Sequence, residues 1–313
     1  MTELKDSGID TGLDVIPVAG YIGAEVRGVD LRGPLEAAVV QEIRDALFRY
    51  KVIFFRDQEI GHAEQISFAK NFGKVTPAHP HEESPPEGFP QILPIDSRRY
   101  EATLGRKRTS YDSSWHTDVT ALVNPPAASI LRAHILPPHG GDTAWTNLVV
   151  AYENLPTELR ELADKIYIRH QFNTKAVAGS QRDRKVAEAN LAAWHPAVRV
   201  HPVTGERALF VSPGFTRGPR EIRGFTPAQS ESILKLLWDE ATRTEYTVRF
   251  RWAPGSVAFW DNRATAHLAI PDAGHLGYDR VLYRVTIEGD IPKGVDGRES
   301  ELISGQPFYG SDQ

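Results

Sequence analysis

His116 and Asp118 are one residue apart in the stretch SSWHTDVTALVNPPAASI, and both side chains are common metal ligands. On a β-strand, residues i and i+2 point to the same face, so this pair can occupy adjacent positions around one ion. The pattern His-x-Asp also arises by chance, and a single histidine is commonly a hydrogen-bonded structural residue. The pair alone therefore leaves a metal site and a structural role both open.

In VAFWDNRATAHLAI (257–270) a strand-like run ends in Trp-Asp-Asn-Arg, and a third candidate ligand, His267, follows it. Two imidazoles and one carboxylate leave open coordination positions and suit a non-haem Fe(II) oxygenase. Arg280 and Arg284 follow, and residues four apart share a face of an ideal strand. Because arginine pairs with carboxylate and similar oxyanions, the two side chains favour a cavity for two anionic ligands. A solvated strand face with two surface arginines is the alternative.

The overall composition narrows the class of protein. The chain has 313 residues, 41% of them apolar and 25% charged, which is typical of a soluble globular protein of one large or two small domains. A net charge of −5 gives no basic surface for nucleic acid or membrane. The absence of cysteine excludes disulfides, thiolate catalysis and cysteine-ligated zinc. The polar N-terminus and the lack of a long apolar run favour a cytoplasmic location.

The elements that must position these residues are mostly short strands. Helices are expected over 34–50, with Pro34 in the first turn, over about 62–72 and 156–165, and from a Thr226–Gln229 capping box to about 241. Strand-like runs occur at 52–55, 128–135, 166–172, 196–201, 207–212, 246–252, 256–260 and 281–287. This pattern predicts a mainly β fold with outer helices, such as a jelly roll.

Two stretches are expected to lack regular structure. Residues 1–15 have the character of a loose tail, and residues 76–112 are rich first in proline and then in arginine and lysine. Long loops inside compact domains are commonly functional, so 76–112 is a candidate active-site loop. Its basic part, 98–108, is either a solvated face or a lid that gathers anions.

Several longer motifs occur in one order along most of the chain, from about residue 20 to 295. Together they resemble the taurine dioxygenase (TauD/TfdA) family of Fe(II)- and 2-oxoglutarate-dependent oxygenases, close to the sulfonate and alkylsulfate dioxygenases. The motifs are WHTDVT, PPAASILRA, GGDT.W, HPV.G..ALFV, WDNRAT.H and the Arg-x-x-x-Arg pair. The resemblance implies a single domain over 1–313 with a double-stranded β-helix (jelly roll) core. It also implies Fe(II), 2-oxoglutarate as cosubstrate, and O2.

The resemblance assigns roles around the iron residue by residue. His116, Asp118 and His267 match the iron ligands. Thr143 and Arg280 match residues that bind the carboxylates of 2-oxoglutarate. The alternative for Thr143 is a purely structural hydroxyl at the start of a strand.

The resemblance also implies a pocket for the prime substrate. Arg284 matches the arginine that holds its anionic sulfo group, with His79 and the backbone N–H of Val119 as further contacts and Phe215 as an apolar wall. The alternatives are a plain loop residue for His79 and a core residue for Phe215. At the far end, Tyr111 and Asp112 stand where an asparagine is expected beside a substrate amine. The segment 173–181 departs from the family pattern as well. The anion end of the pocket therefore follows the family pattern, whereas the amine end departs from it and leaves Asp112 as the candidate partner for an ammonium.

The implied reaction hydroxylates the carbon next to the sulfo group of a small organosulfonate or alkyl sulfate. It would release sulfite or sulfate and an aldehyde, with succinate and CO2. Two alternatives stay open: a same-family oxygenase acting on a carboxylate such as an aryloxyalkanoate, and a cupin-like metal binder without turnover. The expected partner is a small anionic organic substrate rather than nucleic acid or membrane, and a homodimer or homotetramer is expected.

Overall fold

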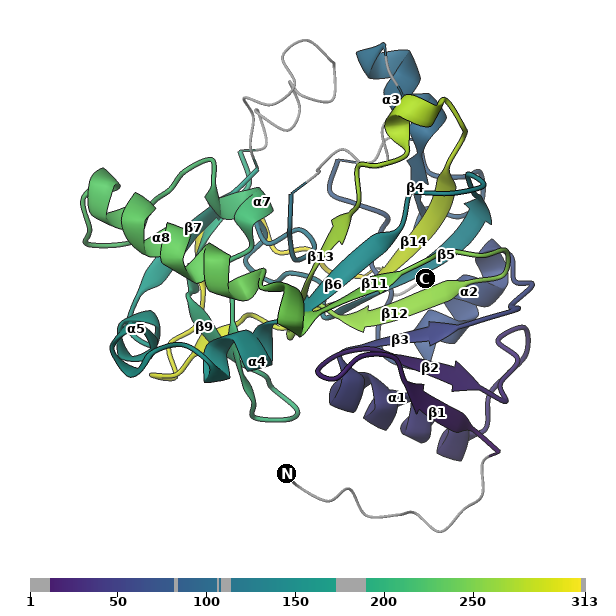
Figure 1. The fold of residues 1–313 in the computed structure, drawn as a ribbon, viewed down its shortest axis with the longest axis horizontal. Helices are drawn as coiled ribbons and strands as arrows, with labels where there is room; N and C mark the ends of the chain where they lie inside the picture. The colour runs from purple at the N-terminus through teal and green to yellow at the C-terminus, as the bar shows by residue number, and fades with distance from the viewer. Residues whose placement is uncertain (1–11, 82–83, 106, 108–113, 173–189, 311–313) are drawn as a thin grey trace.

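Two β-sheets face each other at the centre of the protein (Figure 1). The computed structural model describes residues 12–81, 84–105, 107, 114–172 and 190–310. The larger sheet has the strand order β1 (Asp14–Pro17), β2 (Ala24–Arg27), β3 (Val52–Phe55), β12 (Val257–Asp261), β5 (Ala128–Ile135), β14 (Val281–Ile287) and β4 (Leu93–Asp96). The smaller sheet has the order β11 (Thr247–Phe250), β6 (Thr143–Asn147) and β13 (Thr265–Ala269).

Apolar side chains fill the space between these sheets. Phe54, Leu131 and Trp260 from the larger sheet pack with Trp145 and Phe250 from the smaller one. Strand side chains alternate between two faces, so every second residue of β12 and β5 enters this core. The arrangement confirms the predicted mainly β, jelly-roll core, and it buries one face of β6 and β13, which carry candidate site residues.

Helices cover the outer face of the larger sheet. α1 (Ala37–Tyr50) and α2 (His62–Lys70) place Ile43, Leu47 and Ile66 against Ile53 and Phe259 of the sheet. Each helix therefore buries an apolar stripe on the side away from the inter-sheet core.

A second group of elements extends the molecule beyond β6 and β13 (Figure 1). Its core contains Leu148, Val198 and Leu237. Two three-stranded sheets belong to it, β10 (Arg207–Leu209), β9 (Val198–Val200) and β15 (Lys293–Gly294), and β16 (Glu301–Ser304), β8 (Ala192–Pro196) and β7 (Tyr167–Gln171). The helices around it are α4 (Leu148–Glu153), α5 (Thr157–Ala163), α7 (Pro213–Thr216) and α8 (Pro227–Ala241). Two 3-10 turns lie in the connections next to the smaller sheet: η1 (Thr244–Tyr246) precedes β11, and η2 (Gly274–Leu276) follows β13. None of the helices in the described ranges is long and apolar enough to cross a membrane.

The expected elements agree with the structure where the sequence pattern extends over many residues. The strands at 128–135 and 281–287 are confirmed, and so is the Thr226–Gln229 capping box of α8. The first helix, however, begins at Ala37, because Glu36 has extended backbone angles of φ −60° and ψ 144°. Pro34 therefore lies outside the helix, and its predicted place in the first turn is wrong.

Two expectations about irregular segments need correction. The loop predicted over 76–112 contains β4 and the helix α3 (Ser97–Leu104), because β4 pairs with β14 and the Asp96 carboxylate caps α3 by accepting the Arg98 N–H at 2.9 Å. The tail predicted over 1–15 ends earlier, because β1 begins at Asp14 and pairs with β2. Residues 1–11 lie outside the described part of the chain.

Ion pairs fix the basic segment 98–108 at both ends of its described part. The guanidinium of Arg98 pairs with Asp96 at 2.7 Å, and the Lys107 Nζ pairs with Asp279 at 2.7 Å. These carboxylates neutralise two of the charges that a lid would use to attract anions.

Candidate active site

The three predicted metal ligands meet at the edge of the smaller sheet. The ligand atoms of His116, Asp118 and His267 all lie within 4.8 Å of one another. His267 is on β13, and His116 pairs with it in an isolated antiparallel bridge. The expectation of a regular strand for His-x-Asp is wrong, because only His116 pairs and Asp118 already begins a turn.

The protonation states of these side chains suit metal binding. Burial lowers the pKa of His267 to about 3, so its imidazole is neutral. Burial alone would raise the pKa of Asp118, but the charges of Arg284, His267 and His116 lower it to about 2. Metal ligands must be deprotonated. The donor set is therefore ready for an ion such as Fe(II) without loss of a proton from these two groups.

A hydrogen bond to the backbone fixes the orientation of the His116 ring. Its Nδ1 lies 2.9 Å from the carbonyl oxygen of Ser114, which makes Nδ1 the donor and leaves Nε2 unprotonated toward the site. The Nδ1 of His267 is buried and has no hydrogen-bond partner within the described ranges.

Asp118 is held by a chain of hydrogen bonds that runs into the inter-sheet core. Ser129 donates to its Oδ2 at 2.6 Å, Asn262 donates to the Ser129 hydroxyl at 2.8 Å, and Trp260 donates to the Asn262 Oδ1 at 2.9 Å. The Trp260 ring also lies 4.9 Å from the His267 ring, whereas Trp115 packs against the second core. Sequence reasoning missed Ser129 and Asn262, although both lie inside the quoted motifs PPAASILRA and WDNRAT.H.

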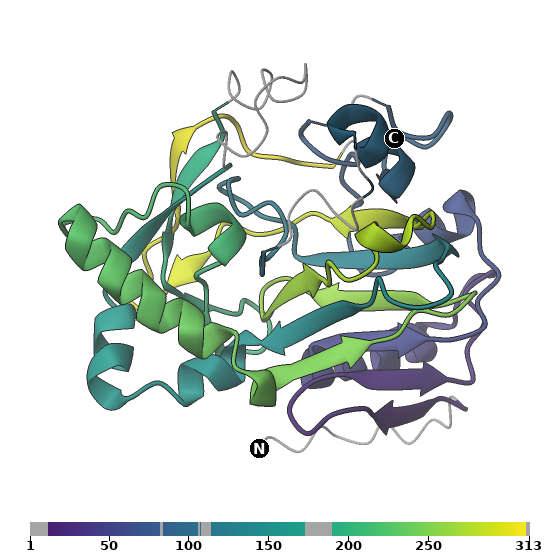
Figure 2. The same cartoon turned by 45° about the horizontal axis from the view of Figure 1, so that its top comes forward.

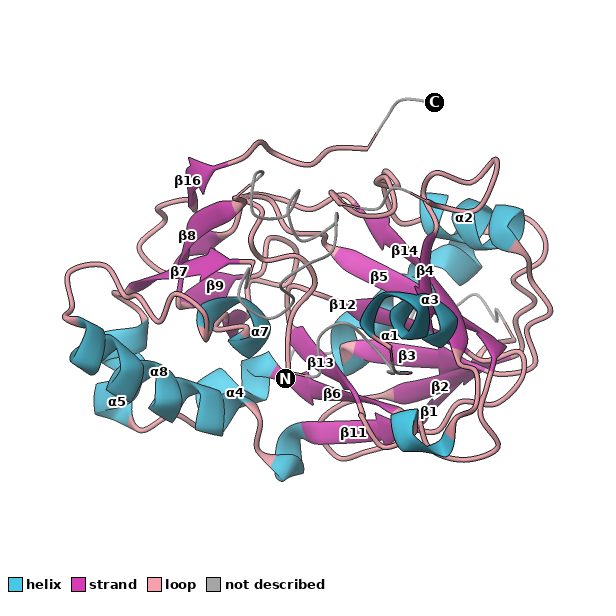
Figure 3. Ribbon diagram, turned by 90° about the horizontal axis from the view of Figure 1, so that it is seen from above, coloured by secondary structure: helices cyan, strands magenta, loops and turns pink. Residues whose placement is uncertain are grey.

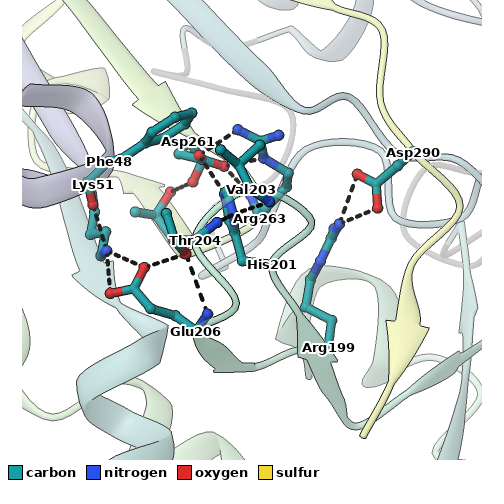
Figure 4. Close-up of polar contacts among 11 residues, drawn as sticks. Phe48, Lys51, Arg199, His201, Val203, Thr204, Glu206, Asp261, Arg263 and Asp290 are labelled. Atoms are coloured by element: carbon teal, nitrogen blue, oxygen red, sulfur yellow. Dashed lines mark hydrogen bonds and ion pairs between the residues drawn. The ribbon is translucent and has the colours of Figure 1, made fainter. Parts of the chain in front are cut away.

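The turn between β12 and β13 is anchored by a buried charge cluster (Figure 4). The Asp261 carboxylate accepts from His201 Nε2 at 2.9 Å and from two nitrogens of Arg263 at 2.8 and 2.7 Å. Burial would raise the pKa of Asp261, but Arg263 and His201 hold it well below its usual value. Nearby, Lys51 Nζ binds the Glu206 carboxylate at 2.7 Å. The cluster fixes the turn that holds Asn262 and leads into His267.

Arg280 and Thr143 form a second polar corner, and Thr143 lies on β6 two residues before Trp145, which pairs with His267. Arg280 Nε donates to the Gly141 carbonyl at 2.8 Å, and its Nη2 lies 3.5 Å from the Thr143 hydroxyl. Gly141 has φ +72°, and a Cβ there would lie 2.9 Å from Arg280 Cδ. Burial lowers the pKa of Arg280 to about 10, so it stays cationic at neutral pH. A buried cation beside a hydroxyl fits a carboxylate.

Arg284 lies closest to the metal ligands. Its Nη1 contacts the Asp118 Oδ1, and its Nε is buried without a hydrogen-bond partner among the described residues. Arg280 and Arg284 are 3% and 7% exposed, so the alternative of a solvated strand face is wrong. Leu282, two residues before Arg284 in β14, packs in the inter-sheet core, which places this face of the strand inward.

An apolar cluster adjoins the ligands on the side of the second core. We call Val119, Ala121, Leu122, Leu191 and Phe215 the apolar pocket cluster, with Phe172 and Phe308 packed against it. Val119 follows Asp118 directly and has φ +49°, which is strained for a β-branched residue. The Phe215 ring lies 6.4 Å from the ring of His116. These side chains therefore form an apolar surface next to the metal ligands.

Of the remaining residues predicted to contact the substrate, the structure describes His79 but not Tyr111 or Asp112. The His79 ring lies 5.8 Å from the Phe172 ring, which in turn lies 5.2 Å from Phe215. His79 is thus linked to the apolar pocket cluster through one aromatic ring. Tyr111, Asp112 and the segment 173–181 lie outside the described residues.

The model of one protein family matches residues 14–286, and that family is described as "Taurine catabolism dioxygenase TauD, TfdA family". This chain belongs to the TauD/TfdA family. The match covers most of the chain, as the sequence motifs predict. The family assignment makes this chain a 2-oxoglutarate-dependent dioxygenase that uses O2 and Fe(II). A metal binder without turnover is therefore excluded.

Relatives within the TauD/TfdA family cover almost all of this chain. An alpha-ketoglutarate-dependent sulfate ester dioxygenase from Pseudomonas putida is 43% identical over 92% of this chain and 93% of its own length. An alkylsulfatase from Acinetobacter baylyi is 35% identical over 91% of this chain and 88% of its own length. The crystal structure of a taurine dioxygenase from Burkholderia xenovorans superimposes with a TM-score of 0.79 at 45% identity, covering 94% of this chain and 97% of that chain.

Proposed function

We propose that this dioxygenase oxidises the carbon next to the ester oxygen of a primary alkyl sulfate. The products would be an aldehyde and sulfate, while 2-oxoglutarate is converted to succinate and CO2. The observation that carries the proposal is the buried guanidinium of Arg284 beside Asp118, whose Nε is buried and has no hydrogen-bond partner among the described residues.

The anion is assigned to Arg284 on energetic grounds. A buried N–H without an acceptor costs on the order of 1–3 kcal/mol, and this cost is removed when a ligand oxygen accepts from it. A sulfate ester brings three terminal oxygens, which suits a charge-assisted contact to this guanidinium. The backbone N–H of Val119, held in a strained turn after Asp118, would give a further donor.

The cosubstrate is assigned to the other arginine. Arg280 and the Thr143 hydroxyl would hold the distal carboxylate of 2-oxoglutarate, because both lie together in the buried corner next to Gly141. His116, Asp118 and His267 would hold Fe(II), which when bound supplies the activation of O2 that the hydroxylation needs. The two anions would thus have separate cations four residues apart.

The apolar pocket cluster supports an alkyl rather than an amino group beyond the reacting carbon. Phe215 and Val119 offer it no charged partner, and both are buried. Two relatives with 43% and 35% identity bear names that specify sulfate esters or alkyl sulfates. A sulfonate is the second candidate, because the structure with 45% identity is that of a taurine dioxygenase.

A substrate panel tests the proposal. The purified protein would be incubated with Fe(II), ascorbate, 2-oxoglutarate and hexyl sulfate, pentanesulfonate, taurine or an aryloxyalkanoate. Succinate, sulfate and sulfite would be measured separately. We expect the highest kcat/KM with hexyl sulfate; a tenfold preference for taurine, about 1.4 kcal/mol in the transition state, would contradict it. A cytoplasmic location and a homodimer or homotetramer stay predictions from the sequence.

A further inference from the structure

The C-terminal segment after β16 crosses from the small sheet β16-β8-β7 back toward the larger sheet (Figures 2 and 3). It is fixed at Phe308 by the buried side chain of Asn124. Asn124 Nδ2 donates to the Phe308 carbonyl at 3.0 Å, and the Phe308 N–H donates to Asn124 Oδ1 at 2.8 Å. Two residues later the Gly310 N–H donates to Glu288 at 2.7 Å. We call residues 305–310 the C-terminal strap.

The strap lies in close contact with the body of the protein at both of its ends. Gly305 has φ +94°, and a Cβ there would lie 2.1 Å from the Leu191 side chain. A Cβ on Gly310 would lie 2.6 Å from the Val75 carbonyl. The positive φ at Gly305 and the backbone carbonyl beside Gly310 both favour glycine, so the strap approaches the body of the protein closely at these two positions.

The Phe308 side chain of the strap is partly buried and packs against the apolar pocket cluster. The neighbouring Tyr309 is 54% exposed, so the strap turns one aromatic ring inward and the next outward. The cluster borders the iron ligands through Val119, which follows Asp118, and through Phe215, whose ring is 6.4 Å from His116. Phe308 therefore adds an apolar surface to the cluster that adjoins the reaction centre. It lies beyond residues 14–286, the part matched by the family model.

We infer that Phe308, held by Asn124, forms the distal wall of the pocket for the alkyl chain and determines which chain lengths the enzyme prefers. This rests on the proposed oxidation of alkyl sulfates. With the sulfate at Arg284 and the reacting carbon at the iron ligands, the chain extends over Val119 and Phe215. A short chain ends before Phe308, whereas a longer chain covers its ring.

The test compares Phe308→Ala with the wild-type protein and with the matched control Tyr309→Ala on ethyl, butyl, hexyl and octyl sulfate. The loss of apolar contact to one or two methylenes corresponds to about tenfold in kcat/KM. We expect Phe308→Ala to lower kcat/KM for octyl sulfate about tenfold, and for ethyl sulfate less than about twofold. Phe308→Leu should restore most of the preference for the longer chain, and the KM for 2-oxoglutarate should not change.

Asn124→Ala provides a second variant, because it removes the clamp without changing the aromatic ring. It should shift the chain-length preference in the same direction as Phe308→Ala. An unchanged ratio of octyl to ethyl sulfate in Phe308→Ala, or an equal loss in Tyr309→Ala, would overturn the inference. A uniform loss on all chain lengths would mean that the strap only stabilises the fold, and would overturn it as well.

Binding without turnover separates this inference from the proposed function. Anaerobic calorimetry of the Fe(II)- and 2-oxoglutarate-loaded protein measures the affinity for octyl and ethyl sulfate directly. Tighter binding of octyl sulfate that depends on Phe308 would support the strap as the wall even if no sulfate is released, an outcome that contradicts only the proposed function. A binding preference that is independent of Phe308 would overturn the strap's role, whatever the turnover.

Discussion

His116 and His267 face each other across an isolated antiparallel bridge in which each donates its backbone N–H to the other's carbonyl. The two N···O distances are 2.9 and 2.7 Å, and the two imidazole rings lie 4.2 Å apart. The distance between two ligands is therefore set by backbone hydrogen bonds rather than by side-chain packing alone. Asp118, two residues after His116, completes the set from the following turn.

This geometry predicts that His267→Ala removes Fe(II) binding and leaves the fold intact. The backbone bridge does not need the imidazole, so the circular dichroism spectrum should be unchanged. Anaerobic addition of Fe(II) and 2-oxoglutarate should give a weak visible charge-transfer band in the wild-type protein only. An equal band or full activity in His267→Ala would remove this residue from the ligand set.

Arg280 and Arg284 are predicted to serve different anions. Loss of a buried charged contact costs a few kcal/mol, on the order of 10²-fold in affinity. Arg280→Ala should raise the KM for 2-oxoglutarate, and Arg284→Ala should raise the KM for the alkyl sulfate. Steady-state kinetics with each substrate varied in turn would check this, and equal effects of both variants on 2-oxoglutarate would show that the assignment is wrong.

Gly141→Ala gives an independent test of the cosubstrate corner. An added Cβ would lie 2.9 Å from Arg280 Cδ and would meet a backbone at φ +72°. The Arg280 side chain must then move away from Thr143, so the KM for 2-oxoglutarate should rise several-fold while alkyl sulfate binding is retained. Gly297→Ala is the matched control, because it also has a positive φ but open space around it. A raised KM in both variants would point to general strain instead.

The hydrogen-bond chain behind Asp118 makes Asn262 a positioning residue. Asn262→Ala leaves Ser129 without its donor and loosens the carboxylate ligand. Loss of such an outer partner lowers metal affinity by about 10–100-fold. Fe(II) titration should show this loss, and higher Fe(II) should restore much of kcat. Unchanged Fe(II) affinity in Asn262→Ala would separate this chain of bonds from metal binding.

The sequence predicted the parts of the fold whose signals are local and long. β5 and β14 are continuous apolar or alternating runs, and the Thr226–Gln229 capping box marks the start of α8. β13 was missed, although it carries His267, because five residues between a turn and a loop hold too little periodicity. The bridge to His116 joins positions far apart in the chain, and nothing in the spacing of His-x-Asp reveals it.

The candidate ligands themselves were predictable because their residue types and order are distinctive. The residues behind them were not, because Ser129 and Asn262 act only through positions that the fold brings together. The C-terminal strap likewise has no sequence signal of its own, since Phe308 reaches the apolar pocket cluster through a contact with Asn124, 184 residues away.

The buried cluster around Asp261 predicts a pH-dependent contribution to stability. Asp261 has a pKa well below its usual value in the folded state, so it binds fewer protons than in the unfolded chain. Its stabilising effect is complete above the unfolded pKa of about 3.9 and is lost as the pH falls below that value. Asp261→Asn breaks a buried ion pair and should cost about 3–5 kcal/mol at pH 7, with a smaller difference from wild type at pH 3.

Urea unfolding at several pH values would measure this difference. Asp239→Asn is the matched control, because the Lys235–Asp239 pair is exposed and worth at most about 1 kcal/mol. A difference between wild type and Asp261→Asn that stays constant from pH 7 to pH 3 would show that the ionised carboxylate does not stabilise the fold.

The most direct measurement of the central claim is the coupling of sulfate release to 2-oxoglutarate turnover with an alkyl sulfate as substrate. Wild-type protein with Fe(II), 2-oxoglutarate, O2 and hexyl sulfate should form sulfate, hexanal and succinate in equal amounts, and Arg284→Ala should form sulfate far more slowly. Release of sulfate without O2 or 2-oxoglutarate, or succinate formation that hexyl sulfate does not stimulate, would contradict the account.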